Sequence, residues 1–451
     1  MKGLVLFAAA LSSAQTILNA HSPSFLDQLY GELVHDAPNI SHNRYLYQQQ
    51  QLQPQTDEMD LVFSTNDQKQ PDSYYAHIFN YHMKMRATID LPDKDDVSDI
   101  LVDQNMFGGI VTYAHLPHFH CIAKPSRDTK NKIDVAIIGA PFDTGVSFRP
   151  GARFGPDSIR SAAKRLGSAW NSPKKRPGYP VDPYDPSTHN YSIVDCGDVA
   201  MTPFDNRIAL NQLYRGLRAI SENYKNTGSV YAHPRVITLG GDHTITLMCL
   251  KNLYEQHGRK IKVLHFDSHI DTWDPKVLGG GITNYMSLNH GTFLHYAHEL
   301  GLIQEGHGSN YHVGIRAPLI DTKYDSHHDS YCGFQIIGAA DIDRIGVRGI
   351  VERLKQSYTE EDIKNDTPVY ISVDIDVLDP AYAPGTGTME VGGFTTRELL
   401  SILDGLKGSE LGNHLVGCDV VEVSPPFDSN SGITSLAATA VIDSFLKIMV
   451  R

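Results

Sequence analysis

The chain has 451 residues, of which 41% are hydrophobic and 20% are charged, so it can bury a core and is not globally disordered. Its formal net charge of -13 argues against a surface that binds nucleic acid or anionic membranes and is compatible with a cationic substrate. The five cysteines are scattered, which argues against a disulfide scaffold and a thiolate zinc site. Their odd number leaves at least one free thiol unless a partner chain supplies another.

Residues 1–20 predict a secretory signal peptide. Lys2 gives the positive start, the apolar run at 4–11 is too short to span a bilayer, and small residues follow. The alternative is a short apolar N-terminus of a cytosolic protein. Three glycosylation sequons are compatible with the secretory route; they begin at Asn39, Asn190 and Asn365. We therefore expect a secreted or secretory-pathway glycoprotein without a membrane span, with the vacuole or the cell wall as alternative destinations.

Residues 21–107 form a polar N-terminal leader or extension to which we assign no chemistry. It contains a glutamine-rich stretch at 48–55, shows no sustained periodicity and is expected to be partly helical near 25–33. The pattern changes at about residue 108, so we predict one catalytic domain over residues 108–451.

Short apolar runs alternate with amphipathic segments through this domain. The runs predict strands at 134–139, 192–194, 235–239, 262–266, 311–314, 334–338, 369–373 and 415–421. The amphipathic segments predict helices such as 207–224, 245–256, 347–357 and 395–406. This alternation indicates an α/β fold with a parallel sheet, whose active site forms beyond the carboxyl ends of the strands.

Two polar motifs follow predicted strands. In Gly-Gly-Asp-His at 240–243 the glycines allow a sharp turn from which His243 projects, although a lone histidine is more often structural. The second motif places Asp267, His269 and Asp271 at alternate positions, where side chains face the same way. A solvated edge strand shows the same alternation, but two acids and a histidine after a buried strand favour a metal site.

Two further carboxylates, Asp374 and Asp376, follow the predicted strand at 369–373. Their like charges repel each other unless a cation lies between them; the alternative is that one caps a helix and the other forms a turn. All three motifs together offer four carboxylates and two imidazoles, with no thiolate. This set favours manganese or a similar ion over structural zinc. It also favours two ions about 3.5–4 Å apart, which would lower the pKa of a shared water.

Glu422 and His290 complete the candidate site. Glu422 follows the predicted strand at 415–421 and could bind a cationic group of the substrate. His290 begins a predicted helix after a glycine-rich loop at 279–281 and is a candidate proton shuttle. Each residue alone is as often structural as functional.

These motifs, in this order, resemble the ureohydrolases, the arginase and agmatinase family, over about residues 108–451. The resemblance implies a three-layer α/β/α sandwich around an eight-stranded parallel sheet, and a homo-oligomer, either a trimer or a hexamer. It also implies two Mn²⁺ ions per subunit. The ligands of the first would be His243, Asp267, Asp271 and Asp374. Those of the second would be Asp267, His269, Asp374 and Asp376.

The resemblance further implies a reaction that splits a guanidinium group into urea and a primary amine. A hydroxide between the metal ions would attack the guanidinium carbon while Asp271 accepts its hydrogen bond. Glu422 would orient the guanidinium, and His290 would pass a proton to the leaving amine. Three departures from the family pattern remove no ligand, namely Thr244, Ser268 and Ser424, although Ser424 can alter how Glu422 is positioned.

The substrate implied is agmatine, which would yield putrescine for polyamine biosynthesis. The segments at 271–274 and 289–292 resemble agmatinases more than arginases, and the polar loop with which arginases hold an amino-acid head group is not found. Guanidinobutyrate and other guanidino acids stay open as alternatives. Two rival functions share the fold: a histone-deacetylase-like amidohydrolase with a single zinc, and a secreted binding protein without turnover. The additional His243 and Asp271 favour the binuclear enzyme.

Overall fold

The computed structural model describes residues 111–124, 132–166, 181–224, 232–278 and 287–450. The chain divides into two compact units after residue 93, and all of the described residues lie in the second unit, residues 94–451. Several predictions lie outside the described residues: the signal peptide, the leader at 21–107 with its helix near 25–33, the sequon at Asn39 and the glycine-rich loop at 279–281.

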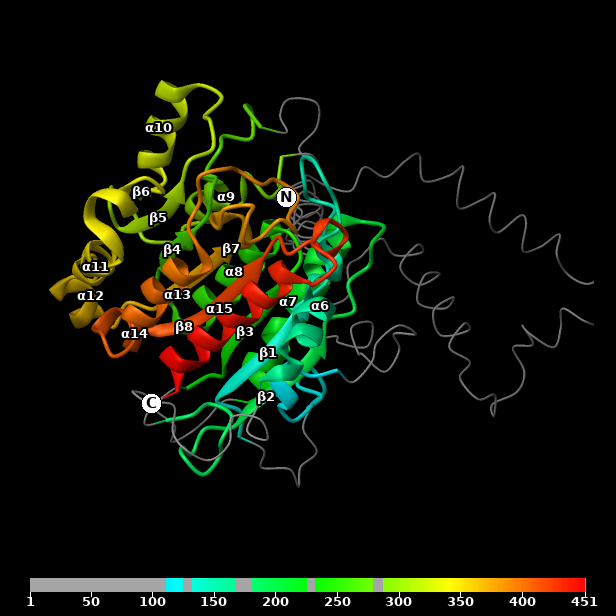
Figure 1. Ribbon diagram of the computed structural model, residues 1–451. Coiled ribbons are helices and arrows are strands. Elements are labelled where there is room, and N and C mark those ends of the chain that lie inside the picture. The colour runs from blue at the N-terminus through cyan, green and yellow to red at the C-terminus, as the bar shows by residue number, and fades with distance from the viewer. Residues whose placement is uncertain (1–110, 125–131, 167–180, 225–231, 279–286, 451) are drawn as a thin grey trace, which may run out of the picture. The chain divides into compact units, whose positions relative to one another are not determined.

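A parallel sheet of eight strands forms the centre of the described domain (Figure 1). Its strands are β1 (Val135–Ala140), β2 (Ile193–Asp198), β3 (Arg235–Gly240), β4 (Lys262–Phe266), β5 (Asn310–Ile315), β6 (Phe334–Gly338), β7 (Val369–Asp374) and β8 (Leu415–Val421). They lie in the order β2-β1-β3-β8-β7-β4-β5-β6, and every neighbouring pair is parallel. Each of the eight predicted strands overlaps one of these, so the predicted parallel sheet is confirmed.

The burial of the strands follows their position in the sheet. The four central strands β3, β8, β7 and β4 are buried along their whole length. Partly exposed positions occur in the edge strands β2 and β6, which have a neighbour on one side only. Continuous apolar runs in the sequence mark the central strands because helices cover both faces there.

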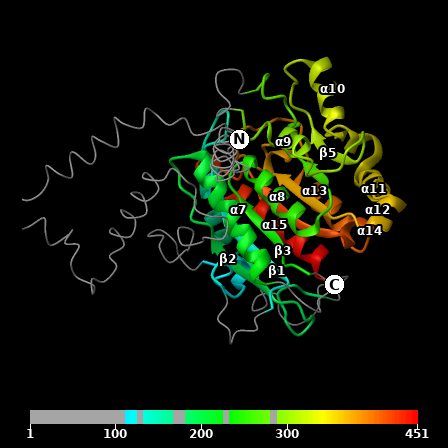
Figure 2. The same cartoon turned by 180° about the vertical axis from the view of Figure 1, so that it is seen from behind.

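Helices cover both faces of the sheet, as Figures 1 and 2 show from opposite sides. One layer contains α6 (Gly155–Ala162), α15 (Ile433–Met449), α13 (Thr396–Gly405) and α11 (Asp341–Gln356), which pack against one another in turn. The other contains α7 (Asn206–Asn223), α8 (Thr246–His257) and α9 (Phe293–Glu299). The other helices of the described domain are α10 (Thr322–Tyr331), which packs on β6, α12 (Glu360–Asn365) and α14 (Glu410–Asn413), which packs on α15. The three-layer α/β/α arrangement implied by the family resemblance is therefore confirmed.

Two predicted helix starts need correction. The helix predicted at 347–357 belongs to α11, which begins earlier, at Asp341, and contains a break where Gly346 has φ 65° and ψ 175°. The amphipathic pattern identified only the part after this break. His290 does not begin a helix, because α9 starts at Phe293.

The segment before β1 is fastened to the edge of the sheet by a disulfide between Cys121 and Cys196 of β2. The sequence did not predict this pair, because a separation of 75 residues gives no local signal. Cys249, Cys332 and Cys418 are free and buried, which agrees with the expectation of at least one free thiol. Within the described residues, no helix is long and apolar enough to cross a membrane.

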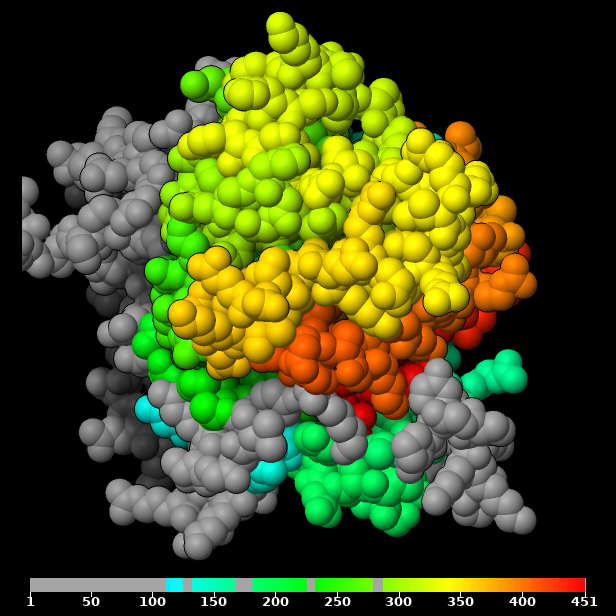
Figure 3. Space-filling model, turned by 90° about the vertical axis from the view of Figure 1, so that its left-hand side faces the viewer, coloured from blue at the N-terminus to red at the C-terminus, as the bar shows by residue number. Residues whose placement is uncertain are grey.

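Sheet topology explains why distant motifs meet. The motifs at 240–243, 267–271, 374–376 and 421–423 follow β3, β4, β7 and β8, which are four adjacent strands. Because all strands are parallel, their carboxyl ends lie at one edge of the sheet. Figure 3 shows another side of the domain, where residues of α10 to α12, coloured yellow, lie at the surface.

Candidate metal centre and active site

His243 reaches the carboxyl edge of the sheet through a turn that requires glycine. A Cβ atom on Gly241 would lie 2.0 Å from the carbonyl oxygen of Phe142, so only glycine fits there. The backbone N–H of His243 donates to Glu422 Oε1 at 3.0 Å. This bond joins the loop after β3 to the end of β8.

The imidazole of His243 faces three carboxylates. Its Nδ1 atom lies 3.1 Å from Asp267 Oδ2, 3.1 Å from Asp271 Oδ2 and 3.3 Å from Asp374 Oδ2. All four side chains are buried. The structure thus brings together the four residues expected to hold the first ion, and their role as ligands stays a prediction.

A second group adjoins the first through Asp267. His269 Nδ1 lies 3.3 Å from Asp267 Oδ1 and 3.1 Å from Asp376 Oδ2. Asp374 lies between the two groups, since its Oδ2 faces His243 and its Oδ1 accepts the backbone N–H of Asp376 at 2.8 Å. Asp267 and Asp374 therefore contact members of both groups, as the two carboxylates predicted to be shared should.

The chemistry of this cluster fits divalent cations. Among the described residues, the buried atoms His243 Nδ1 and Asp267 Oδ2 make no hydrogen bond although they lie 3.1 Å apart. Burial and the charge of Asp267 raise the pKa of Asp271 to about 6. Burial and the charges of Asp376 and Asp267 raise the pKa of Asp374 well above its ordinary value. Carboxylates crowded in this way ionise together when cations lie among them.

His243 is held from behind by a buried polar chain. Its Nε2 atom lies 2.7 Å from Ser372 Oγ, which itself donates to Asp419 Oδ1 at 2.6 Å. Because the Ser372 proton goes to Asp419, the serine oxygen must accept from His243 Nε2–H. The Nδ1 lone pair of a neutral His243 then faces the carboxylates, which is the orientation a metal ligand needs.

His265 is a residue that the sequence analysis did not assign. Its Nε2 lies 3.0 Å from Asp267 Oδ2, and its Nδ1 lies 2.8 Å from Nδ1 of His312, whose Nε2 contacts Asp329 Oδ1 at 2.9 Å. Asp329 accepts from His312, so His265 Nδ1–H donates and its Nε2 lone pair faces Asp267. A lone pair there cannot donate to the carboxylate, so His265 offers a further nitrogen that could hold an ion. Its place two residues before Asp267, on the same face of β4, was the available signal.

Glu422 and His290 contact each other beside this cluster. His290 Nδ1 lies 3.2 Å from Glu422 Oε1, and His290 Nε2 accepts the backbone N–H of Ser147 at 3.0 Å. Nε2 also lies 2.8 Å from the Ser147 hydroxyl oxygen. Burial alone would lower the pKa of His290, but the hydrogen bond and charge of Glu422 outweigh it and raise the pKa. A proton is therefore stabilised on His290.

The backbone is strained at two site residues. Asp271 has φ 52° and Glu422 has φ 60°, both in the left-handed region that residues other than glycine seldom adopt. The predicted extended backbone from Asp267 to Asp271 therefore ends in a turn, which aims the Asp271 carboxylate at His243. Such strain persists where surrounding contacts fix the conformation, and it clusters at functional sites.

A cavity of about 210 Å³ opens above the cluster. His269, Asp271, Asp374 and His290 are among the residues that line it. Glu390, whose side chain is 34% exposed, lines it as well, with Oε1 at 3.9 Å from His269 Nε2. Glu422 is not among the lining residues; it lies behind His290, so its direct contact with a substrate stays a prediction.

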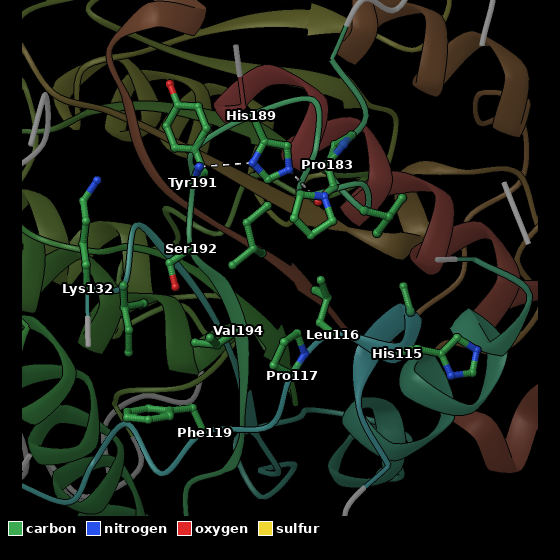
Figure 4. Close-up of a pocket in the computed structure, with 15 residues that line it drawn as sticks. His115, Leu116, Pro117, Phe119, Lys132, Pro183, His189, Tyr191, Ser192 and Val194 are labelled. Atoms are coloured by element: carbon green, nitrogen blue, oxygen red, sulfur yellow. Dashed lines mark hydrogen bonds between the residues drawn. The ribbon is translucent and has the colours of Figure 1, made fainter. Parts of the chain in front are cut away.

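A larger cavity of about 600 Å³ lies elsewhere, beside the outer edge of β2 (Figure 4). Pro117, Phe119 and Tyr191 give it apolar walls, and His189 is held by the backbone N–H of Tyr191. None of its described lining residues is acidic. It therefore offers no carboxylate for a cation, and the smaller cavity is the candidate active site.

Comparisons with known proteins agree with this geometry. The Arginase family model matches residues 133–447. A Schizosaccharomyces pombe protein named "Putative agmatinase 1" is 42% identical over 359 residues, which cover 77% of this chain and 84% of that protein. The guanidinobutyrase of Pseudomonas aeruginosa is 32% identical over 76% of this chain and 93% of its own length.

A solved structure gives the same result. The proclavaminate amidino hydrolase from Streptomyces clavuligerus is 32% identical, has a TM-score of 0.58, and is matched over 76% of this chain and 98% of that one. A sheet of the same arginase-like fold, the clustered carboxylates and imidazoles, and a matching family model over most of the domain lead to one conclusion. The chain belongs to the arginase family and is a ureohydrolase that acts on guanidino compounds.

Proposed function

We propose that this ureohydrolase is a binuclear manganese enzyme that converts agmatine and water into putrescine and urea. The observation that carries the substrate assignment is the charge of the cavity. Asp271, Asp374 and Glu390 line it, whereas its described lining residues include no lysine or arginine. Such a lining favours a substrate with two cationic ends over one with an anionic end.

Agmatine is such a substrate, since it carries a guanidinium at one end and an ammonium at the other. Asp271 and Asp374 would be taken up by the ions, so with the guanidinium at the metal centre the ammonium would extend towards Glu390, the partly exposed carboxylate of the lining. The carboxylate of guanidinobutyrate would meet the same glutamate and would find no cation among the described lining residues. Guanidinobutyrase activity is therefore the second candidate, favoured by the relative that carries this name.

The donor set supports manganese as the metal. It consists of four aspartates and two histidines without a sulfur ligand, a mixture that suits manganese. Two divalent ions bound there would lower the pKa of a water molecule and supply a nucleophile at neutral pH. The carboxylate of Asp271 lies both in the cavity wall and beside His243, so it can accept a hydrogen bond from that nucleophile.

His290 supplies the proton that the leaving amine needs. When the C–N bond to the amine breaks, the nitrogen must gain a proton, and Glu422 raises the pKa of His290 so that one is held there. When His290 carries a proton on both ring nitrogens, Nε2 no longer accepts the backbone N–H of Ser147 and can instead donate to Ser147 Oγ, 2.8 Å away; Ser147 also lines the cavity. The hydroxyl of Ser147 therefore provides a route from His290 to the substrate.

A substrate panel tests the assignment. The full-length chain, loaded with manganese, is scored for urea released from agmatine, 4-guanidinobutyrate and arginine, and its metal content is measured. We expect agmatine to give the highest kcat/KM and two ions to bind per chain. A higher kcat/KM for guanidinobutyrate than for agmatine would make guanidinobutyrate the assigned substrate. Binding of only one ion per chain would favour the amidohydrolase with a single zinc. Release of no urea from any of them would favour a binding protein without turnover.

We also propose that the protein enters the secretory pathway and assembles as a trimer or hexamer. The Cys121–Cys196 disulfide supports the secretory route, because such bonds persist in oxidising compartments. Asn190 and Asn365, which begin two of the sequons, are exposed. Glycosidase treatment and N-terminal sequencing of the exported protein test the route, and light scattering tests the oligomer. An unglycosylated cytosolic protein, or a monomer at micromolar concentration, would contradict these proposals.

A further inference from the structure

A second group of metal-binding side chains lies between helices α9 and α10. His295 Nδ1 lies 3.1 Å from His328 Nε2, and His328 Nε2 lies 3.8 Å from the sulfur of Cys332. Atoms of all three residues lie within 4.8 Å of one another. We propose that His295, His328 and Cys332 bind a divalent ion of the zinc class, independently of the binuclear centre.

The spacing of the donor atoms fits such an ion. A tetrahedral ion with bonds of about 2.0–2.1 Å to nitrogen and about 2.3 Å to sulfur holds its ligand atoms about 3.3–3.6 Å apart. The observed separations of 3.1 and 3.8 Å differ from this by a few tenths of an ångström. His328 and Cys332 are four residues apart at the end of α10, so they lie on one side of it, and His295 faces them from α9.

The surroundings act on the donor groups in opposite ways. Cys332 is fully buried, and burial raises the pKa of its thiol well above its usual value, so an ion must displace the thiol proton in order to bind. Burial and the neighbouring His328 lower the pKa of His295 to about 4, which keeps this imidazole in its neutral, metal-binding form. Binding therefore breaks the S–H bond of Cys332, forms a metal–sulfur bond and releases the proton to solvent.

One imidazole is a candidate for the fourth position, and one carboxylate adds negative charge nearby. His298, three residues after His295 on α9, has a buried Nδ1 that makes no hydrogen bond among the described residues. The carboxylate of Asp274 interacts electrostatically with both imidazoles and with the thiol. The scattered cysteines argued against a thiolate site because they form no local pair. In the proposed site a single cysteine would share the ion with histidines from two helices.

An ion at this site would link helices α9 and α10, both of which adjoin residues of the active-site cavity. Helix α9 begins at Phe293, three residues after His290. Helix α10 carries Asp325, which accepts from Trp273 Nε1 at 3.3 Å, and Asp329, which accepts from Thr272 Oγ1 at 2.6 Å. An ion held between the helices would therefore join the supports of two walls of the active-site cavity, away from the cavity itself.

Cobalt provides a test that does not depend on urea release. The full-length chain, with its main centre filled by manganese, is titrated with Co²⁺, and thiolate-to-cobalt charge-transfer absorption is recorded. We expect this band to saturate at one ion per chain and Zn²⁺ to remove it by competition. Only a site with a cysteine ligand produces the band, so cobalt that enters the main centre is not counted. Absence of the band in the wild-type chain would overturn the proposal.

Matched variants locate the band. Cys332→Ser and His328→Ala should abolish it, while His327→Ala, which changes the exposed neighbour on α10, should keep it. Cys249→Ser removes a buried free thiol elsewhere and should also keep it. A band that survives Cys332→Ser would place the thiolate elsewhere, and loss of the band in His327→Ala would show that the variants act through folding. Zn²⁺ should raise the Tm of the wild-type chain and leave that of Cys332→Ser unchanged; equal shifts would contradict the proposal.

Discussion

Replacing Ser372 by alanine should weaken metal binding without touching any ligand. The Ser372 hydroxyl accepts from His243 Nε2–H and donates to Asp419 Oδ1, and both partners are fully buried. In the variant the ring of His243 loses the contact that fixes its orientation and its proton position. A neutral His243 can then carry its proton on Nδ1, where it blocks the lone pair that a metal ion needs.

The expected magnitude follows from these two contacts. Loss of a partner that orients a metal-bound histidine typically costs 10–100-fold in metal affinity, which is about 1.4–2.7 kcal/mol. The buried N–H of His243 and one oxygen of Asp419 lose a partner, and each such group costs about 1–3 kcal/mol of folding stability. Asp419 keeps its bonds from Thr246 and Tyr370 through Oδ2, so we expect the lower part of that range for it.

Tyr370→Phe is the matched control. It removes the hydrogen bond of 2.7 Å from the tyrosine hydroxyl to Asp419 Oδ2 and leaves the contact between Ser372 and His243 in place. Both variants are compared by Tm and by urea release at increasing manganese concentration. We expect both to lower Tm, but only Ser372→Ala to shift the manganese dependence by at least tenfold. Equal manganese dependence in the two variants would refute the orienting role of Ser372.

Three further predictions concern the site itself. Asp267→Ala removes a carboxylate shared by both groups of ligands, so we expect loss of activity and of bound manganese, and full activity would contradict the assignment. Glu422→Gln removes the charge that raises the pKa of His290, so kcat should fall by about 10² and KM should rise while metal content stays normal; lost metal would make Glu422 structural. Glu390→Gln should raise the KM for agmatine up to about fivefold, as expected for a partly exposed ion pair, and should leave the KM for guanidinobutyrate unchanged or lower. Equal changes in KM for agmatine and guanidinobutyrate would show that Glu390 does not distinguish between the two substrates.

The sequence predicted the parts of the molecule that local patterns determine. Continuous apolar runs identified β3, β4, β7 and β8, because helices cover both faces of these strands. Polar residues directly after those runs identified the candidate ligands, because parallel strands end at one edge of the sheet. The order of the strands could not be predicted, since it depends on which crossovers pack together.

Contacts between distant segments explain most of what the sequence did not reveal. Ser372 and Asp419 lie inside predicted strands, where a single polar residue reads as an interruption of an apolar run. Only the pairing of β7 with β8 shows that they form one chain behind His243, and their register places them side by side. His312 and Asp329 escaped notice for the same reason, because they support His265 from β5 and α10.

Backbone strain at Asp271 and Glu422 is the feature that sequence patterns are least able to predict. A left-handed conformation costs a residue with a Cβ about 1–2 kcal/mol, so local preference argues against it at both positions. Glycine would remove that cost but would also remove the carboxylate. The Asp271 carboxylate faces His243 at 3.1 Å, and Glu422 holds both His290 and the backbone of His243. These contacts, made from the turned backbone, offset the cost of the conformation and link the strain to the chemistry of the site.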